Sequence, residues 1–348
     1  MIAPASPTPY LSVVATARND NHGGDLLGRM NLFINGLMQQ AERFRLPLEL
    51  ILVEWNPPEE NARLHEALRL PERSQYGQIR FITVPNDTHS RFEHSHALPL
   101  FQMIGKNVGI RRARGEFILA TNIDLLFSHE LIQYLAKKKL RRDRLVRIDR
   151  IDVAEGVPTN GSLDDQLDWC EQNIIRVNGR DATLDLRTQD EHRIYHPMDR
   201  RAWLLEKLQD WDLVPVVTRK RLHLNGCGDF TLLHRDRWAM LRGYPEFEMF
   251  SMHLDSVLCT AAYFSGCREQ VLQPPMRCYH VEHAVGSGWS KEGEAKLNAR
   301  LEKAGIPQTS NQQFDYTAKG MRRRREPRIY NEETWGLAQD TFEEVVHG

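Results

Sequence analysis

One segment, residues 106–124, constrains the fold of this 348-residue chain more than any other. A helix-like run stops at Gly115 and gives way to an apolar strand, Phe117–Ala120. The strand is followed by two oxygen-bearing side chains, Asn122 and Asp124. In α/β sheets, side chains at the carboxyl ends of buried strands face the ligand. A carboxylate there suits Mg²⁺ or Mn²⁺ holding a diphosphate.

Apolar runs and helical periodicities alternate along the first 140 residues. Apolar and β-branched runs predict buried strands at residues 11–17, 48–54, 79–84 and 117–120. Apolar spacing predicts helices at residues 26–44, 64–68 and 101–114, and Ser128 is expected to cap a helix over 129–140. Such alternation with short links is typical of α/β folds, so the sequence predicts a mainly parallel sheet flanked by helices.

The second half of the chain has weaker patterns. Residues 150–225 are polar with little periodicity, and we expect an insertion there with one or two short helices, for example over residues 163–170. Beyond it we expect strands at residues 230–234 and 270–282, helices at 237–241, 255–264 and 291–304, and then a basic, polar tail.

Composition narrows the function classes. Lys and Arg total 46 against 47 Asp and Glu, a net charge of −1. The chain therefore lacks the excess positive charge that is typical of nucleic-acid-binding proteins. Five cysteines without Cys-x-x-Cys spacing argue against a structural zinc site and for a reducing compartment. The first ten residues lack the charged and apolar regions of a secretion signal, and no apolar run approaches the ~18–20 residues of a membrane span. We therefore expect a cytoplasmic protein.

Four segments resemble, in the same order, those of family-2-like, nucleotide-sugar-dependent glycosyltransferases of the GT-A fold. They are residues 11–20, 48–56, 106–124 (Asn-x-Gly-x-x-x-Ala-x-Gly, a strand, then Asn-x-Asp) and 228–246, and the resemblance covers residues 10–135 and 225–290. It implies a GT-A, Rossmann-like sheet with an acceptor-side insertion. Three positions depart from the family pattern: Asn122 replaces the first Asp of Asp-x-Asp, Trp55 begins a Trp-Asn-Pro in place of Asp-Gly-Ser, and Leu254 replaces a Glu.

The resemblance also implies a division of labour along one domain. Residues 1–150 would form the nucleotide-sugar-binding half, residues 151–290 the acceptor-binding and catalytic half, and residues 291–348 a C-terminal helical, basic tail. The implied activity is transfer of a sugar from a nucleotide diphosphate sugar, with UDP as the expected nucleotide, to the hydroxyl of a glycan, a lipid-linked acceptor or a small molecule. The implied cofactor is Mn²⁺ or Mg²⁺.

The resemblance assigns the donor site to strand ends and to one helix. Asp124 would ligate the ion, and Asn122 would offer an amide oxygen to the ion or a hydrogen bond to the ribose. Turns after strands are often rich in Asn and Asp without binding anything, which is the alternative for both. The other implied donor contacts are Ala15, Thr16, Arg18, Glu54, Lys106 and Asn107. For Glu54 the alternative is a carboxylate that caps the next turn.

Asp255 is the implied catalytic residue. Counting back from Gly266, it matches the Asp of the family's Glu-Asp pair, which implies the general base of an inverting reaction. From the residues alone, the alternative is a helix N-cap. His280 and His283 follow a strand, and the resemblance implies that one or both are further metal ligands; the alternative is ordinary surface histidine.

Two other functions stay open from the sequence. A nucleotidyltransferase could use a similar sheet, but no Gly-rich loop directly follows the first strand to hold a triphosphate. A catalytically degenerate sugar-nucleotide-binding or scaffold protein would explain Asn122 and Leu254. Basic runs at residues 137–144 and 322–325 are usually solvated faces or mobile tails, and the alternative is peripheral contact with an anionic membrane surface at its inner face.

Overall fold

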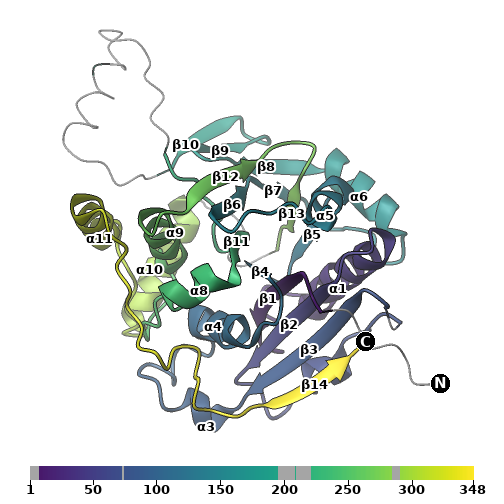
Figure 1. The fold of residues 1–348 in the computed structure, drawn as a ribbon, viewed down its shortest axis with the longest axis horizontal. Coiled ribbons are helices and arrows are strands. Elements are labelled where there is room, and N and C mark those ends of the chain that lie inside the picture. The colour runs from purple at the N-terminus through teal and green to yellow at the C-terminus, as the bar shows by residue number, and fades with distance from the viewer. Residues whose placement is uncertain (1–7, 73, 195–207, 209–220, 284–290) are drawn as a thin grey trace.

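The strands of the chain assemble into two β-sheets in the computed structural model (Figure 1). The structure describes residues 8–348 except 73, 195–207, 209–220 and 284–290. Eight strands form the larger sheet, in the order β12-β6-β11-β4-β1-β2-β3-β14, and six form the smaller one, in the order β10-β9-β8-β7-β13-β5. Helices pack on both faces of the larger sheet, so the described part of the chain is a mixed α/β fold, as the sequence predicts.

The centre of the larger sheet is parallel and was predictable from apolar runs. Its strands are β1 (Leu11–Ala17), β2 (Leu48–Trp55), β3 (Gly77–Val84) and β4 (Phe117–Ala120). Strand β1 pairs in parallel with both β2 and β4, and β2 pairs in parallel with β3. The order 3-2-1-4 therefore reverses between β1 and β4, and parallel α/β sheets bind ligands at the carboxyl ends beside such a reversal.

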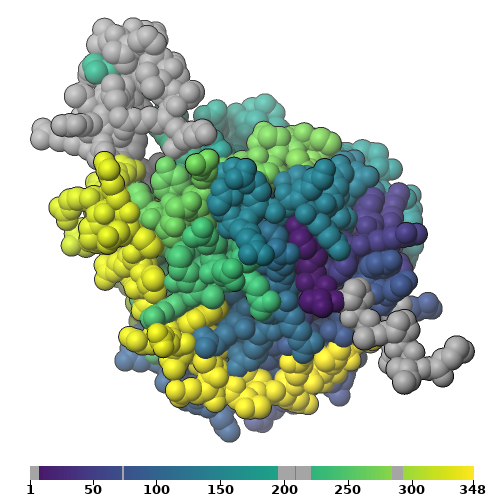
Figure 2. Space-filling view, viewed as in Figure 1, coloured from purple at the N-terminus to yellow at the C-terminus, as the bar shows by residue number. Residues whose placement is uncertain are grey.

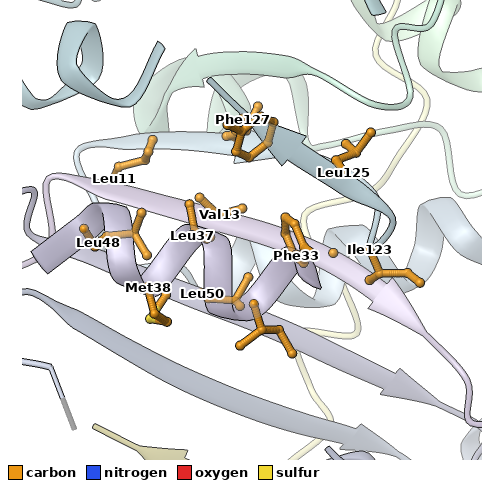
Figure 3. Packing of buried hydrophobic residues seen from close by; sticks show 14 of the residues in the cluster. Leu11, Val13, Phe33, Leu37, Met38, Leu48, Leu50, Ile123, Leu125 and Phe127 are labelled. Carbon is orange, nitrogen blue, oxygen red and sulfur yellow. The ribbon is translucent and has the colours of Figure 1, made fainter. Parts of the chain in front are cut away.

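Helices cover the two faces of this sheet because successive strand residues point to opposite sides. On one face, α1 (Leu26–Arg43) places Phe33 and Leu37 against Leu11 and Val13 of β1 (Figure 3). On the other face lie α4 (Gln102–Arg112), α8 (Arg235–Leu241) and α9 (Leu254–Phe264). The shorter helices are α2 (Leu64–Ala67), α3 (Asn86–His89) and α5 (His129–Ala136); α5 is capped by the Ser128 hydroxyl, which accepts a hydrogen bond from Leu131 N, as predicted.

Beyond β4 the larger sheet becomes mixed. Strand β11 (Thr231–His234) runs antiparallel to β4 and to β6 (Arg144–Ile148), and β12 (Arg268–Leu272) pairs in parallel with β6. The expectation of a mainly parallel sheet therefore holds for its centre, while its β11 side carries antiparallel pairs.

The smaller sheet accounts for most of the polar insertion. It contains β5 (Leu125–Phe127), β13 (Cys278–Val281), β7 (Arg150–Val153), β8 (Ile174–Asn178), β9 (Ala182–Asp185) and β10 (Asp190–Arg193). The expected short helix is α6 (Leu163–Gln172). The expectation of an otherwise irregular insertion is wrong for residues 150–194, where antiparallel strands dominate. The rest of the insertion to residue 220 lies almost entirely outside the described residues.

The predicted single strand over residues 270–282 is also wrong. Strand β12 ends at Leu272 in the larger sheet, and β13 begins at Cys278 in the smaller one. Pro274 and Pro275 lie between them, and proline cannot donate a ladder hydrogen bond, so the strand is interrupted. The break moves the chain from one sheet to the other and brings β13 beside β5.

The C-terminal segment returns to the first half of the chain. The predicted helix over residues 291–304 is α10 (Lys291–Lys303), and it is followed by α11 (Asn311–Arg324) and β14 (Glu343–His347). Strand β14 pairs antiparallel with β3 at the edge of the larger sheet (Figure 1). Buried Arg80 of β3 pairs with Glu344, at 2.6 Å, and with Glu49, at 2.8 Å. The expected polar tail is therefore partly built into the sheet.

None of the helices within the described residues is long and apolar enough to cross a bilayer.

Candidate metal centre and surrounding site

Three predicted metal ligands converge where the two sheets meet. Asp124 directly precedes β5, and His280 lies on β13, opposite Leu125 in the β5–β13 pair. Val281 N donates a hydrogen bond to the carbonyl of Asp124, at 3.0 Å, which fixes the two strands at this point. His283 lies two residues after Val281, beyond the end of β13. One ligand atom from each of Asp124, His280 and His283 lies within 4.8 Å of the others.

This cluster fits a divalent cation. Asp124 Oδ2 is 3.6 Å from Nε2 of His280 and 3.3 Å from Nε2 of His283. The other carboxylate oxygen, Asp124 Oδ1, is buried and has no hydrogen-bond partner among the described residues. An unpartnered buried lone pair is costly unless something neutralises it. Two imidazoles and one carboxylate suit Mn²⁺ or Zn²⁺ better than Mg²⁺, which prefers oxygen.

Asp124 and His280 each shift the pKa of the other. Burial alone would raise the pKa of Asp124, but His280 and His283 lower it well below its usual range. Burial likewise acts to lower the pKa of His280, but Asp124 and the neighbouring Asp152 outweigh it and raise the pKa to about 9. Since a metal ligand must be deprotonated, a cation entering this cluster displaces a proton.

Asp152 lies behind His280 and was not predicted. Strand β7 pairs in parallel with β13 so that Asp152 stands opposite His280, with its Oδ1 3.3 Å from the ring Nδ1. Arg150 Nε approaches the same oxygen at 2.8 Å, and Arg176 approaches the other oxygen at 2.7 Å. A usable sequence signal was present, because Arg150 and Asp152 alternate with apolar Ile151 along a strand-like run.

A second polar cluster surrounds Lys106 on α4. The Lys106 side chain has no exposed surface and donates to Asn122 Oδ1 and to the carbonyl of Gly228, both at 2.8 Å. Asn122 also accepts from Gln102 and donates to Asp229 at 2.5 Å. Burial lowers the pKa of Lys106 to about 8, although the nearby carboxylates of Asp229 and Asp255 act to raise it. The amide of Asn122 is thus bonded to protein on both sides.

Lys106 and Asn107 contact different parts of the protein, although the sequence analysis expects both as donor contacts. Asn107 donates to the carbonyl of Tyr244 at 2.8 Å and to Glu246 at 3.0 Å, and it accepts from Tyr244 N at 2.8 Å. Gly243 is essential to this contact, since a Cβ there would lie 2.2 Å from Asn107 Oδ1. Asn107 therefore braces the loop after α8, and its role at the donor site stays a prediction.

Asp255 lies in the first turn of α9. The helix begins at Leu254 and its N-cap is His253, so the alternative that Asp255 is the N-cap is wrong. Asp255 Oδ1 accepts a hydrogen bond from Ser256 N at 2.7 Å. Asp255 Oδ2 lies close to Gly228, 3.1 Å from where a Cβ on that glycine would stand. The same glycine accepts the hydrogen bond from Lys106, so Asp255 adjoins the lysine cluster.

The predicted donor turn lies at the carboxyl end of β1. Ala15 is fully buried, and Thr16 Oγ1 is buried with no hydrogen-bond partner among the described residues. Arg18 Nε donates to the carbonyl of Asn56 at 2.7 Å, and Arg18 pairs with Asp20 at 2.8 Å. These contacts fix the turn, and its binding role stays a prediction.

Glu54 is buried at the end of β2. One of its oxygens accepts from Leu64 N at 3.0 Å, at the start of α2, and the other has no hydrogen-bond partner among the described residues. Burial raises its pKa from 4.5 to about 7. The capping alternative describes the observed contact, and the donor role stays a prediction.

A glycine pair missed in the sequence adjoins the metal cluster. Gly23 and Gly24, in the loop between β1 and α1, both have φ of +73°. A Cβ on Gly23 would lie 2.6 Å from Nδ1 of His283, whereas a Cβ on Gly24 would meet nothing within 4 Å. Gly23 therefore leaves room for the imidazole, and adjacent glycines before a helix were the available signal.

Comparison with known proteins gives little beyond this geometry. No family model matches the chain, and no curated protein matches it. Among solved structures, the chain is similar to a crystal structure of S. aureus TarS 1-349, with 14% sequence identity and a TM-score of 0.43 over 88% of this chain and 69% of that one. A likeness of this size assigns no activity.

Proposed function

We propose that this protein is an inverting glycosyltransferase of the GT-A type, with a nucleotide diphosphate sugar, expected to be UDP-linked, as donor. The observation that carries the proposal is the cluster of Asp124, His280 and His283 beside the carboxyl ends of the parallel strands. Sheets of this kind bind ligands there, and a cation held there would lie where a diphosphate is expected. Asp124 belongs to one of the four segments that resemble the family.

The chain's own residues would divide the work as follows. Asp124, His280 and His283 would hold Mn²⁺, favoured over Mg²⁺ by the two imidazoles, and the bound ion would neutralise the departing diphosphate. Asp255 would accept the proton of the acceptor hydroxyl while its oxygen bonds to the anomeric carbon. The bond from that carbon to the diphosphate oxygen breaks, and the nucleoside diphosphate leaves with the electron pair.

The donor contacts are proposed from the strand ends. Ala15, Thr16 and Arg18 would lie against the nucleotide, and Asn122 would reach the ribose only by exchanging one of its present hydrogen bonds. Lys106 would balance the negative charge around Asp255 rather than contact the donor directly.

A glycan, lipid-linked or small-molecule acceptor is expected, in the cytoplasm. Lys137–Lys139, Arg141 and Arg142 are exposed, and Arg237 Nε donates to the carbonyl of Arg142 at 3.5 Å. In Figure 2 the teal segment around α5 lies beside the green segment that contains α8 on the visible face. We propose peripheral contact of this face with anionic lipid, which salt would weaken.

The proposal is tested by donor hydrolysis and by calorimetric titration of UDP with and without Mn²⁺. Wild type should hydrolyse or transfer from a nucleotide sugar only with the metal, and Asp124→Ala should lose metal-dependent UDP binding because it removes the charged ligand. Asp236→Ala, which removes an exposed carboxylate on α8, is the control. Equal UDP affinity in wild type and Asp124→Ala would remove the metal site, and nucleotide binding without any turnover would favour a scaffold protein.

A further inference from the structure

We infer that Asp152 is a positioning residue for the metal centre, which holds the imidazole of His280 with its Nε2 toward Asp124. The inference rests on the metal site of the proposed function. It concerns how that site is organised before any donor binds.

The geometry places His280 between two carboxylates. Its Nδ1 is 3.3 Å from Asp152 Oδ1, and its Nε2 is 3.6 Å from Asp124 Oδ2. A neutral imidazole offers one nitrogen to a metal only when the other carries the proton. Nδ1 and Asp152 Oδ1 form an ion pair without a hydrogen bond among the described residues. When the ring is neutral and Nε2 ligates an ion, the proton lies on Nδ1, where the adjacent carboxylate can accept a hydrogen bond from it and fix the ring orientation. The backbone pairing of β7 with β13 sets this contact, because it brings the two residues opposite each other.

Asp152 is itself held rigidly. Its side chain has no exposed surface and lies between the guanidinium groups of Arg150, at 2.8 Å, and Arg176, at 2.7 Å. A buried carboxylate without such partners would be strongly destabilising. The two arginines therefore keep Asp152 ionised and immobile, as an acceptor for His280 must be.

Charge balance alone does not account for Asp152. Arg150 also pairs with Asp229, at 2.8 Å, and Arg176 also pairs with Asp185, at 3.2 Å, so each arginine has another carboxylate. Of these three aspartates, Asp152 is the one with a recorded ion pair to His280 in the described part of the chain. That contact distinguishes it from its neighbours.

Asp185 supplies a matched control. It contacts the same Arg176 from β9 and is also largely buried, with 13% of its side chain exposed. We compare wild type, Asp152→Asn and Asp185→Asn, all full-length, with Mn²⁺ alone and no nucleotide. Electron paramagnetic resonance measures the dissociation constant for Mn²⁺ at one fixed pH, and electron spin-echo modulation reports the nitrogen atoms that ligate the ion. Thermal melting in EDTA reports the stability of the metal-free protein.

We expect Asp152→Asn to weaken Mn²⁺ binding by ~10–100-fold, the usual cost of losing such a supporting contact, and Asp185→Asn to change it by less than about threefold. The nitrogen modulation of the bound ion should diminish in Asp152→Asn alone. Equal Mn²⁺ affinity in wild type and Asp152→Asn would overturn the inference. So would equal weakening in both variants, because that would reflect the shared arginine.

A second variant covers the case in which Asp152→Asn does not fold. Asp152→Glu keeps the carboxylate and its charge but moves its oxygens along the strand, so it should fold and still bind Mn²⁺ less tightly than wild type. Unfolding of both variants in EDTA would overturn the inference and make Asp152 a folding residue. These outcomes are separable from those of the proposed function. If wild type binds Mn²⁺ but transfers no sugar, the proposed function fails and the inference stands. If wild type transfers sugar and Asp152→Asn binds Mn²⁺ as tightly as wild type, only the inference fails.

Discussion

The buried carboxyl of Glu54 makes the stability of the protein depend on pH in a way that can be calculated. Its pKa is about 7 in the folded protein against an ordinary 4.5. Between these values the folded state binds more protons than the unfolded state, so the free energy of unfolding falls as the pH rises. Integrated from pH 5 to pH 8, this one group lowers the free energy of unfolding by about 2–3 kcal/mol.

Glu54→Gln removes the titration but keeps an oxygen that can accept from Leu64 N. The free energy of unfolding of the variant, relative to wild type, should therefore be higher at pH 8 than at pH 5 by about 2–3 kcal/mol. Urea denaturation at the two pH values measures this, and taking the difference cancels any effect of the amide that does not depend on pH. Glu60→Gln, at an exposed carboxyl in the next loop, is the control. Parallel pH curves for wild type and Glu54→Gln would refute the reasoning.

Three further substitutions test the site. Asp255→Asn should reduce transfer by ~10²–10⁴-fold with little change in donor affinity or melting temperature, since the amide oxygen of asparagine can still accept from Ser256 N. Turnover within about threefold of wild type would exclude a general base. Asn122→Asp places a second carboxylate beside the buried carboxylate of Asp229, so we expect a lower melting temperature without tighter Mn²⁺ binding. Tighter Mn²⁺ binding would show that position 122 reaches the ion. Gly23→Ala should weaken Mn²⁺ binding by displacing His283, whereas Gly24→Ala strains the same backbone conformation without that contact; equal effects would point to strain alone.

The parts of the fold that the sequence predicted are those governed by local pattern. The apolar run at residues 11–17 coincides with β1, and the helical spacing of residues 26–44 coincides with α1 to within one residue. In such segments burial on one or both faces determines the periodicity directly. By contrast, β8 and β9 carry Arg176 and Asp185, which pair with each other, so charged residues interrupt the apolar pattern of the short strands in the smaller sheet.

The candidate site shows the same division between local pattern and distant pairing. Asp124, His280 and His283 were expected as ligands from the family resemblance, and the structure brings their ligand atoms together. Asp152 was missed because its proximity to His280 depends on the pairing of two strands distant in sequence. The separate orientations of Lys106 and Asn107 were missed for a related reason: neighbours on a helix point about 100° apart, and the packing partners decide which one faces the site.

The late arrival of β14 has a consequence for synthesis of the protein. Strand β3 ends at Val84, and β14, which covers its outer edge, begins only at Glu343. While the intervening chain emerges from the ribosome, that edge has no partner, and unpaired edges invite association with other chains. Arg80 sits on this edge with a charge that another chain would have to bury. The arginine that later receives Glu344 can thus protect the nascent protein against aggregation until β14 arrives.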